Sequence, residues 1–453
     1  MRKLLFFIIA TVIFCSCGDN TGGKTGGAKI KQEGVNTQES SILLSKPTVN
    51  VYIENSASMD GYVKGTTEFE LAVYNYLSDI KISDVTDTLN LFYINSKPIS
   101  YAATADINVI SDFIEKLEPN EFRRRGGNRG TTDISNVFKD ILSENSENDV
   151  AVLVTDGIFS PGKGKDAAEY LVNQQIGIKN TITEYLKKCP NTAVVVYQLS
   201  SKFTSNAAEN IYYYNREDKK IIVNAQRPYY IWVIGNMKHI TKLKLLVSEN
   251  NFKGGGIQHS YTFLPSSIDE FNDEFLTHLE RKPKYAILNS PKFGSFERGK
   301  KATKTSIFNI KKAKDGQHKG QFMFSIGMDL TLFQLLLSDE YLMNTDSYAR
   351  MIDKQSNNDY FIDIEYNTTP NTSYTHNMKL STEKIVTGEL EIVLRSQMPQ
   401  WVYDINDDEG LDIFKNDAIN KTYGIKYLVE GIYEAYKMRG NDIYTTMNFN
   451  LKK

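Results

Sequence analysis

The order of apolar and polar residues divides the chain into two regions of different architecture. Between residues 48 and 250, short apolar segments alternate with longer segments in which the apolar residues have helical spacing. Strands that alternate with helices indicate a mainly parallel sheet covered by helices on both faces. The pattern predicts strands over 49–53, 89–94, 150–155, 193–199 and 229–234, and helices over 67–77, 109–117, 134–142, 166–187 and 237–249.

Hairpins and a second region complete this organisation. Residues 98–102 follow a short turn and predict an antiparallel partner for 89–94, and residues 211–223 predict a hairpin inserted at the sheet edge. From 251 to 453 the segments 321–326, 360–366 and 388–395 alternate apolar and polar residues, as half-exposed antiparallel strands do. Residues 330–337 fit a helix or a strand, and 422–437 predict an amphipathic helix that packs on a sheet. We therefore expect a β-rich (α+β) second domain over 251–453.

The first residues of the chain have the pattern of an export signal. Arg2 and Lys3 precede an apolar run over 4–14, which is shorter than a membrane span. Residues 14–17, Phe-Cys-Ser-Cys, resemble the relaxed lipobox of lipoproteins from Bacteroidota. The resemblance implies a signal peptide over 1–16, lipidation of Cys17 and an anchor in the outer membrane, on a face that the sequence leaves open. An ordinary secretory signal is the alternative, and residues 17–47 read as a flexible tether.

The net charge argues against nucleic-acid binding, and the cysteine content argues against an internal disulfide. The 453 residues carry a formal net charge of -2, so no electrostatic case for nucleic acid exists. On the lipobox resemblance, Cys15 would leave with the signal peptide and Cys17 would carry lipid, so that Cys189 would have no partner for an internal disulfide. We expect Cys189 to be a buried structural thiol.

Three polar loops near the ends of predicted strands carry the candidate chemistry. They are Glu54-Asn-Ser56-Ala-Ser58, Gly130-Thr-Thr132-Asp133 and Thr155-Asp156-Gly157. In open α/β sheets, ligands bind at the carboxyl ends of the strands. Hydroxyl and carboxylate oxygens are hard ligands that suit Mg²⁺, Mn²⁺ or Ca²⁺.

The order of these loops resembles the metal-ion-dependent adhesion site of von Willebrand factor type A domains. The resemblance covers about 49 to 249 and implies a doubly wound, mostly parallel sheet with one antiparallel edge. It implies that Ser56, Ser58 and Thr132 contact the metal, with Thr131 a poorer match, and that Glu54 and Asp156 act through water or hydrogen bonds. A ligand carboxylate would complete the coordination. Glu54 stands where the family has Asp, so the site is either metal-competent or a degenerate relic of the fold.

A basic segment precedes Thr132. Arg123, Arg124, Arg125 and Arg129 form either a solvated loop or a group that steers an acidic ligand toward the metal, since arginine pairs well with carboxylates. The acidic run 404–410 departs from the EF-hand spacing, and we interpret it as a solvated turn.

These patterns favour a binding protein. We expect a lipid-anchored protein that recognises a protein or peptide carboxylate through a divalent metal. The alternative is a structural or assembly lipoprotein that binds its partners elsewhere. We do not expect an enzyme, because the sequence has no nucleophile elbow, P-loop, dinucleotide fingerprint or zinc-protease motif.

Overall fold

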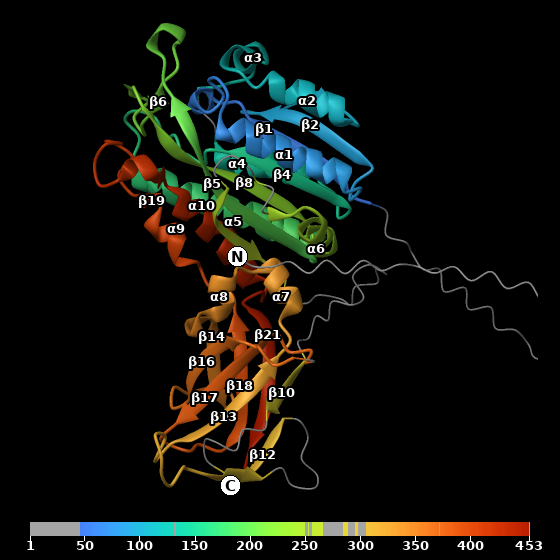
Figure 1. Ribbon diagram of the computed structural model, residues 1–453. Helices are drawn as coiled ribbons and strands as arrows, with labels where there is room; N and C mark the ends of the chain where they lie inside the picture. The colour runs from blue at the N-terminus through green and yellow to red at the C-terminus, as the bar shows by residue number, and fades with distance from the viewer. Residues whose placement is uncertain are drawn as a thin grey trace, which may run out of the picture. The chain divides into compact units, whose positions relative to one another are not determined.

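The computed structural model describes residues 46–130, 133–249, 252, 256–265, 284–288, 295–297, 305–370 and 372–452 (Figure 1). The predicted signal peptide, Cys17 and the tether up to residue 45 lie outside the described residues, and so do Thr131 and Thr132. All described residues belong to one compact unit, which spans Leu44–Lys453.

A seven-stranded sheet forms the centre of the first region, with strand order β3-β2-β1-β4-β8-β5-β9. Its strands are β1 (Thr48–Glu54), β2 (Thr88–Ile94), β3 (Pro98–Ala102), β4 (Asp149–Thr155), β5 (Thr192–Thr204), β8 (Asn224–Asn236) and β9 (Ile257–Phe263). The pairs β1–β2 and β1–β4 are parallel, whereas β2–β3, β4–β8, β5–β8 and β5–β9 are antiparallel. The sheet is therefore mixed, and the α/β class agrees with the sequence.

Helices cover both faces of this sheet. Its strands direct alternate side chains to two hydrophobic clusters, so that Val49 and Val51 join one cluster while Tyr52 joins the other. The first cluster includes α1 (Glu68–Ile82), α2 (Ile107–Glu115), α3 (Pro119–Arg124) and α6 (Met237–Leu246). The second includes α4 (Ile134–Glu144), α5 (Ala167–Lys188) and α10 (Ile425–Met438).

Two strands differ from the expectation of one antiparallel edge. β8 runs antiparallel between β4 and β5, because the chain returns from β5 through residues 205–223 without a crossover helix. That return carries the predicted hairpin as β6 (Tyr213–Tyr214) and β7 (Lys220–Ile221). β9 lies beyond residue 250 in sequence, yet it pairs with β5 and ends the sheet.

The remaining strands form two larger sheets and one small one. One sheet has the order β10-β13-β17-β16, and the other has the order β11-β12-β21-β18-β14-β15. Apolar side chains of both sheets belong to the first cluster, and Tyr285 of β10 packs on Phe449 of β21 with ring centroids 5.3 Å apart. The strands are β10 (Tyr285–Leu288), β11 (Ser295–Glu297), β12 (Ser306–Lys311), β13 (Phe322–Met328), β14 (Tyr348–Ile352), β15 (Gln355–Ser356), β16 (Phe361–Tyr366), β17 (His376–Thr382), β18 (Gly388–Arg395) and β21 (Ile443–Leu451), with β19 (Asn406–Asp407) and β20 (Thr422–Tyr423) as a separate pair.

Four α-helices follow residue 330 in the described part of the chain. They are α7 (Thr331–Leu336), α8 (Asp339–Met343), α9 (Gln400–Asp404) and α10. The amphipathic helix predicted over 422–437 is α10, which packs on α5, and its Tyr436 hydroxyl donates to the Thr192 carbonyl at 2.9 Å. Within the described ranges, no helix combines the length and apolar character needed to cross a membrane.

Candidate functional site

The structure brings two of the three predicted loops together at the carboxyl ends of β1 and β4. These parallel strands are neighbours, and the chain leaves β1 toward β2 on one side while β4 lies on the other. A sheet opens a crevice at such a reversal of strand order. The loop after β1 carries Ser56 and continues into a 3₁₀ helix, Ala57–Gly61, and the loop after β4 carries Asp156.

Oxygen atoms from both loops lie close to one another. The Ser56 and Ser58 hydroxyl oxygens are 2.9 Å apart, and Ser56 is buried. The Glu54 carboxylate is also buried and accepts a hydrogen bond from the Thr155 hydroxyl. Sequence reasoning placed Thr155 in a motif but gave it no role; its hydroxyl links the two strand ends and also accepts from the Gly157 amide at 2.9 Å.

Asp156 directly follows β4 and is a buried acidic residue of the site. Its carboxyl group is buried, and one oxygen accepts a hydrogen bond from the Ile158 amide at 3.0 Å. The other oxygen, Oδ2, is buried and makes no hydrogen bond of ordinary geometry among the described residues, although the Ser58 hydroxyl lies close enough to the carboxyl group to favour its charged form. Burial raises the pKa of Asp156 above its ordinary value, while the Ser58 hydroxyl and the Ile158 amide oppose that rise. A buried carboxylate oxygen with an unused lone pair is an acceptor for a cation.

Arg129 holds the first loop in place. Its guanidinium donates to the carbonyls of Asn55 at 2.7 Å and Ser56 at 3.1 Å and pairs with the buried Asp60 carboxylate. Its own carbonyl accepts from the Ala57 amide at 2.9 Å. Arg123 pairs with the other Asp60 oxygen at 3.2 Å. The predicted ligand-binding residue Arg129 therefore already has three acceptors inside the protein.

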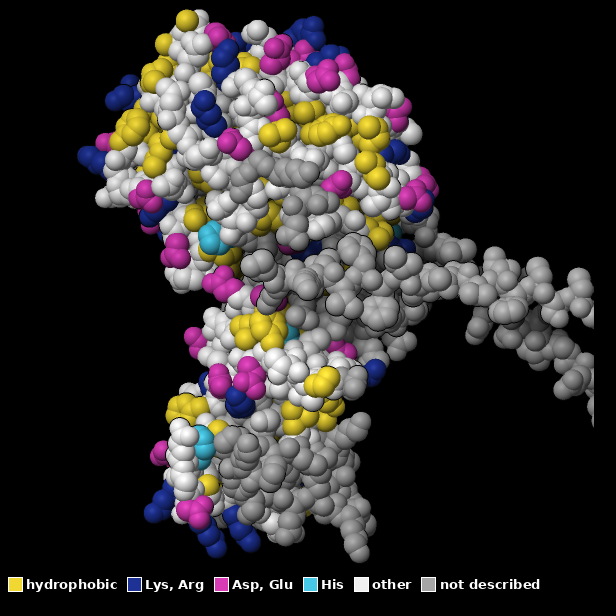
Figure 2. Space-filling view, viewed as in Figure 1, with side chains coloured by type: hydrophobic (Ala, Val, Ile, Leu, Met, Phe, Trp, Pro, Cys, Tyr) yellow, Lys and Arg dark blue, Asp and Glu magenta, His cyan; other side chains and the backbone are white. Residues whose placement is uncertain are grey.

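Arg124 and Arg125 also have carboxylate partners within the protein. Both pair with Glu121, which is buried. Arg125 lies over the rings of Tyr93 and Tyr101, whereas 73% of the Arg124 side chain is exposed. On the face shown in Figure 2, Lys and Arg side chains lie beside Asp and Glu side chains. Of the four arginines named from the sequence, Arg124 is the most accessible to a ligand.

The third loop is described only in part. Thr132 lies outside the described residues, and its neighbour Asp133 caps α4 by accepting from the Asn136 amide at 3.1 Å. Among the described residues, no group of three or more His, Cys, Asp or Glu side chains is arranged to hold a metal ion. The ligand set predicted from the sequence differs from such a group, because serine and threonine hydroxyls supply most of its oxygen atoms. Ser56, Ser58 and the buried Asp156 oxygen offer hard donors that suit a small divalent cation.

Comparison with known proteins identifies no relative. Neither a protein-family model, nor a curated protein, nor a solved structure matches this chain. The α/β class with additional β-sheets rests on the structure alone, and the type A and lipoprotein resemblances stay predictions.

Proposed function

We propose that the protein is a membrane-anchored lipoprotein whose type A-like region binds a carboxylate of a protein or peptide ligand through a divalent metal ion. Ser56, Ser58 and Thr132 would contact the ion, either Mg²⁺ or Mn²⁺, with Ca²⁺ as the larger alternative, and Glu54 and Asp156 would act mostly through water or hydrogen bonds. The bound ion would supply positive charge for the ligand carboxylate. The observation that carries the proposal is the buried Asp156 carboxyl group, which lies beside the Ser58 hydroxyl and whose Oδ2 atom makes no hydrogen bond of ordinary geometry in the described chain.

Calorimetric titration of Mg²⁺ and Mn²⁺ into the protein tests the metal. We expect saturable binding that Asp156→Asn weakens at least tenfold, because the amide removes the charge and keeps the shape. Asp363→Asn is the matched control, since that carboxylate is 75% exposed and belongs to β16. Burial raises the pKa of Asp156, so protons compete with the metal and its affinity should fall as the pH is lowered.

A titration without heat at millimolar metal would refute the metal site. It would favour the alternative, a structural or assembly lipoprotein with a degenerate site. The contacts of Arg129 and Thr155 within the protein are compatible with that alternative, because they stabilise the loops without any ion.

The anchor is tested separately. Cys17→Ser should release the protein from the membrane fraction of the producing cells, because a thioether-linked lipid needs the sulfur atom. Cys15→Ser is the matched control and should leave the protein membrane-bound. If both variants stay in the membrane fraction, the lipoprotein proposal is wrong.

A further inference from the structure

Arg227 is a positively charged residue that is buried inside the protein. It lies on β8 and is 1% exposed. Its Nη1 atom donates to the carbonyls of Ala418 at 2.9 Å and Ile419 at 2.7 Å, and its guanidinium lies over the Tyr213 ring. Within the described part of the chain it makes no ion pair, and its Nε atom has no hydrogen-bond partner. A buried charge is costly unless other charges or dipoles compensate for it.

Asp156 is a buried negative charge that also lacks an ion pair among the described residues. The buried carboxylates of Asp60 and Glu121 differ from it, because each pairs with two arginines. Burial raises the pKa of Asp156, and the charge of Arg227 is among the influences that oppose this rise. The two unpaired charges, Arg227 and Asp156, therefore act on each other inside the protein.

The pairing of β4 with β8 brings these two residues to the same end of the sheet. Thr155, the last residue of β4, lies opposite Tyr230 of the antiparallel β8. Asp156 follows Thr155, and Arg227 precedes Tyr230 by three residues, so both lie just beyond this pair on the same side. The register thus places a buried cation at the strand ends that carry the candidate metal site.

We propose that Arg227 is the internal counter-charge of Asp156 and acts as a positioning residue of the candidate metal site. Without an ion, its charge compensates that of the carboxylate, so the loop after β4 stays folded around Asp156. When a divalent ion binds, the guanidinium opposes it, because charges inside a protein are screened less than charges in water. Arg227 would thus lower the affinity of the site for metal. This effect on the metal rests on the proposed function, whereas the pairing of the two charges does not.

A double-mutant cycle in EDTA tests the charge pair in the absence of metal. Urea unfolding at pH 8 compares the parent, Asp156→Asn, Arg227→Met and the double variant. We expect Arg227→Met to destabilise the Asp156→Asn protein less than the parent, because asparagine has no charge to compensate. The hydrogen bonds to Ala418 and Ile419 are lost in both backgrounds, so they cancel in the cycle. If the Met variant does not fold, Arg227→Gln repeats the cycle with an uncharged N–H donor.

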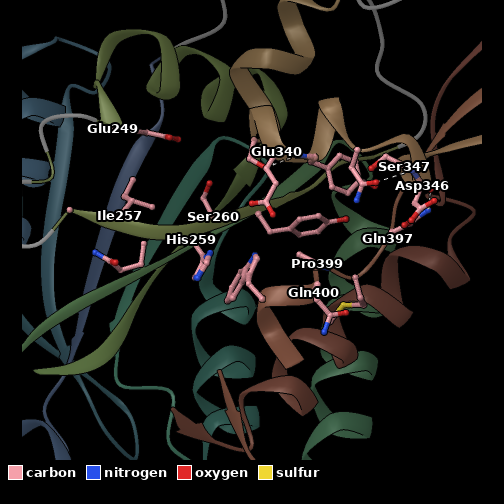
Figure 3. A pocket seen from close by; sticks show the side chains of 18 of the residues that line it. Glu249, Ile257, His259, Ser260, Glu340, Asp346, Ser347, Gln397, Pro399 and Gln400 are labelled. Carbon is pink, nitrogen blue, oxygen red and sulfur yellow. Dashed lines mark hydrogen bonds between the residues drawn. The ribbon is translucent and has the colours of Figure 1, made fainter. Parts of the chain in front are cut away.

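A cleft along β9 supplies the carboxylate for a control cycle (Figure 3). It has a volume of about 810 Å³ and is lined by β9, by the segment 338–347 that includes α8, and by the segment 397–401 that begins α9. Glu340 lines it and is exposed, and neither Asp156 nor Arg227 is among its described lining residues. Arg227→Met and Glu340→Gln should therefore have additive effects on stability. Additive effects of Arg227→Met and Asp156→Asn would overturn the proposal.

Calorimetric titration of Mg²⁺ at pH 8 measures the effect of Arg227 on the proposed metal site. We expect Arg227→Met to bind Mg²⁺ about three- to tenfold more tightly than the parent, and Arg227→Lys, which keeps the charge, to bind it as the parent does. Lys384→Met is the matched control, since this lysine is 76% exposed and pairs with Asp359.

The direction of the change in metal affinity separates an electrostatic role of Arg227 from a purely structural one. Unchanged or weaker Mg²⁺ binding by Arg227→Met would overturn the proposal, because the loss of a residue that only holds the loop would have that result. Equal tightening by Arg227→Lys would overturn it as well. A parent protein that binds no Mg²⁺ would refute the proposed function instead, and the cycle in EDTA would then decide alone whether Arg227 and Asp156 pair.

Discussion

Replacing Arg129 by Met tests whether this arginine belongs to the protein's own framework. The Arg129 side chain is 15% exposed and makes three contacts, with the Asn55 carbonyl, the Ser56 carbonyl and the Asp60 carboxylate. Met keeps the aliphatic packing and removes all three. Removing one partner of a buried ion pair usually costs about 3–5 kcal/mol. Because Arg123 still pairs with Asp60, we expect a loss near the lower end of that range, about 3 kcal/mol.

Arg124→Met is the matched comparison. Arg124 is 73% exposed, and its partner Glu121 keeps the contact with Arg125, so the loss should be within about 1 kcal/mol. Urea unfolding followed by far-ultraviolet circular dichroism measures both variants against the parent protein. Equal stability of Arg129→Met and Arg124→Met would refute the reasoning, because it would mean that the Arg129 contacts contribute nothing beyond those of a surface arginine.

Three further predictions concern single groups elsewhere. Burial raises the pKa of Glu70 from 4.5 to about 7, so the folded protein retains a proton that the unfolded chain releases, and stability should fall as the pH rises from about 4.5 to 7. Glu70→Gln should flatten that part of the stability–pH curve measured by urea titration. In a chain with serine at positions 15 and 17, the buried Cys189 thiol, whose pKa burial raises, should react with a thiol reagent at pH 7 far more slowly when folded than in denaturant. Gly431→Ala should lower the free energy of unfolding by about 1–3 kcal/mol, and with it the melting temperature, because the new Cβ would lie 2.8 Å from the Gln175 carbonyl oxygen. Gly177→Ala, whose new Cβ meets only the Ser135 side chain, should leave the melting temperature almost unchanged.

Periodicity predicted the elements better than their pairing. The apolar run 150–155 is the buried strand β4, and the long amphipathic segment 166–187 is α5. The direction of β8 did not follow from its composition, because a buried strand has the same apolar residues in either orientation. The usable signal was that the return from β5, residues 205–223, carries a hairpin and no α-helix, whereas parallel neighbours are usually joined by a crossover helix. The pairing of β9 with β5 depends on contacts between distant segments, which local patterns do not encode.

The sequence predicted which loops form the candidate site, but it did not predict the contacts between their side chains. Strand ends placed Ser56 and Asp156 at one edge of the sheet, and the structure brings their loops together. The sequence did not show that Arg129 would close back on the first loop, because its partner Asp60 lies outside any recognised motif. Nor did it suggest the cleft along β9, whose walls come from three segments far apart in sequence.

Residues 418–425 pack against β8 and against the loop that carries Asp156. The buried Arg227 of β8 donates to the carbonyls of Ala418 at 2.9 Å and Ile419 at 2.7 Å, and the Tyr230 hydroxyl donates to Thr422 at 2.9 Å. Next along the chain, Ile425 approaches Gly157 so closely that a Cβ there would lie 3.3 Å from its Cδ1 atom.

A fragment ending at residue 250 would lack these partners. The guanidinium of Arg227 would lose both carbonyl acceptors, and one face of the sheet would lose α10, whose apolar residues share a cluster with α5. Leaving a buried charge without its partners is strongly destabilising. The expected division between residues 250 and 251 therefore does not separate the candidate site from the rest of the protein, because the loop that carries Asp156 is packed against the C-terminal segment. Measurements of metal or peptide binding consequently require the whole chain.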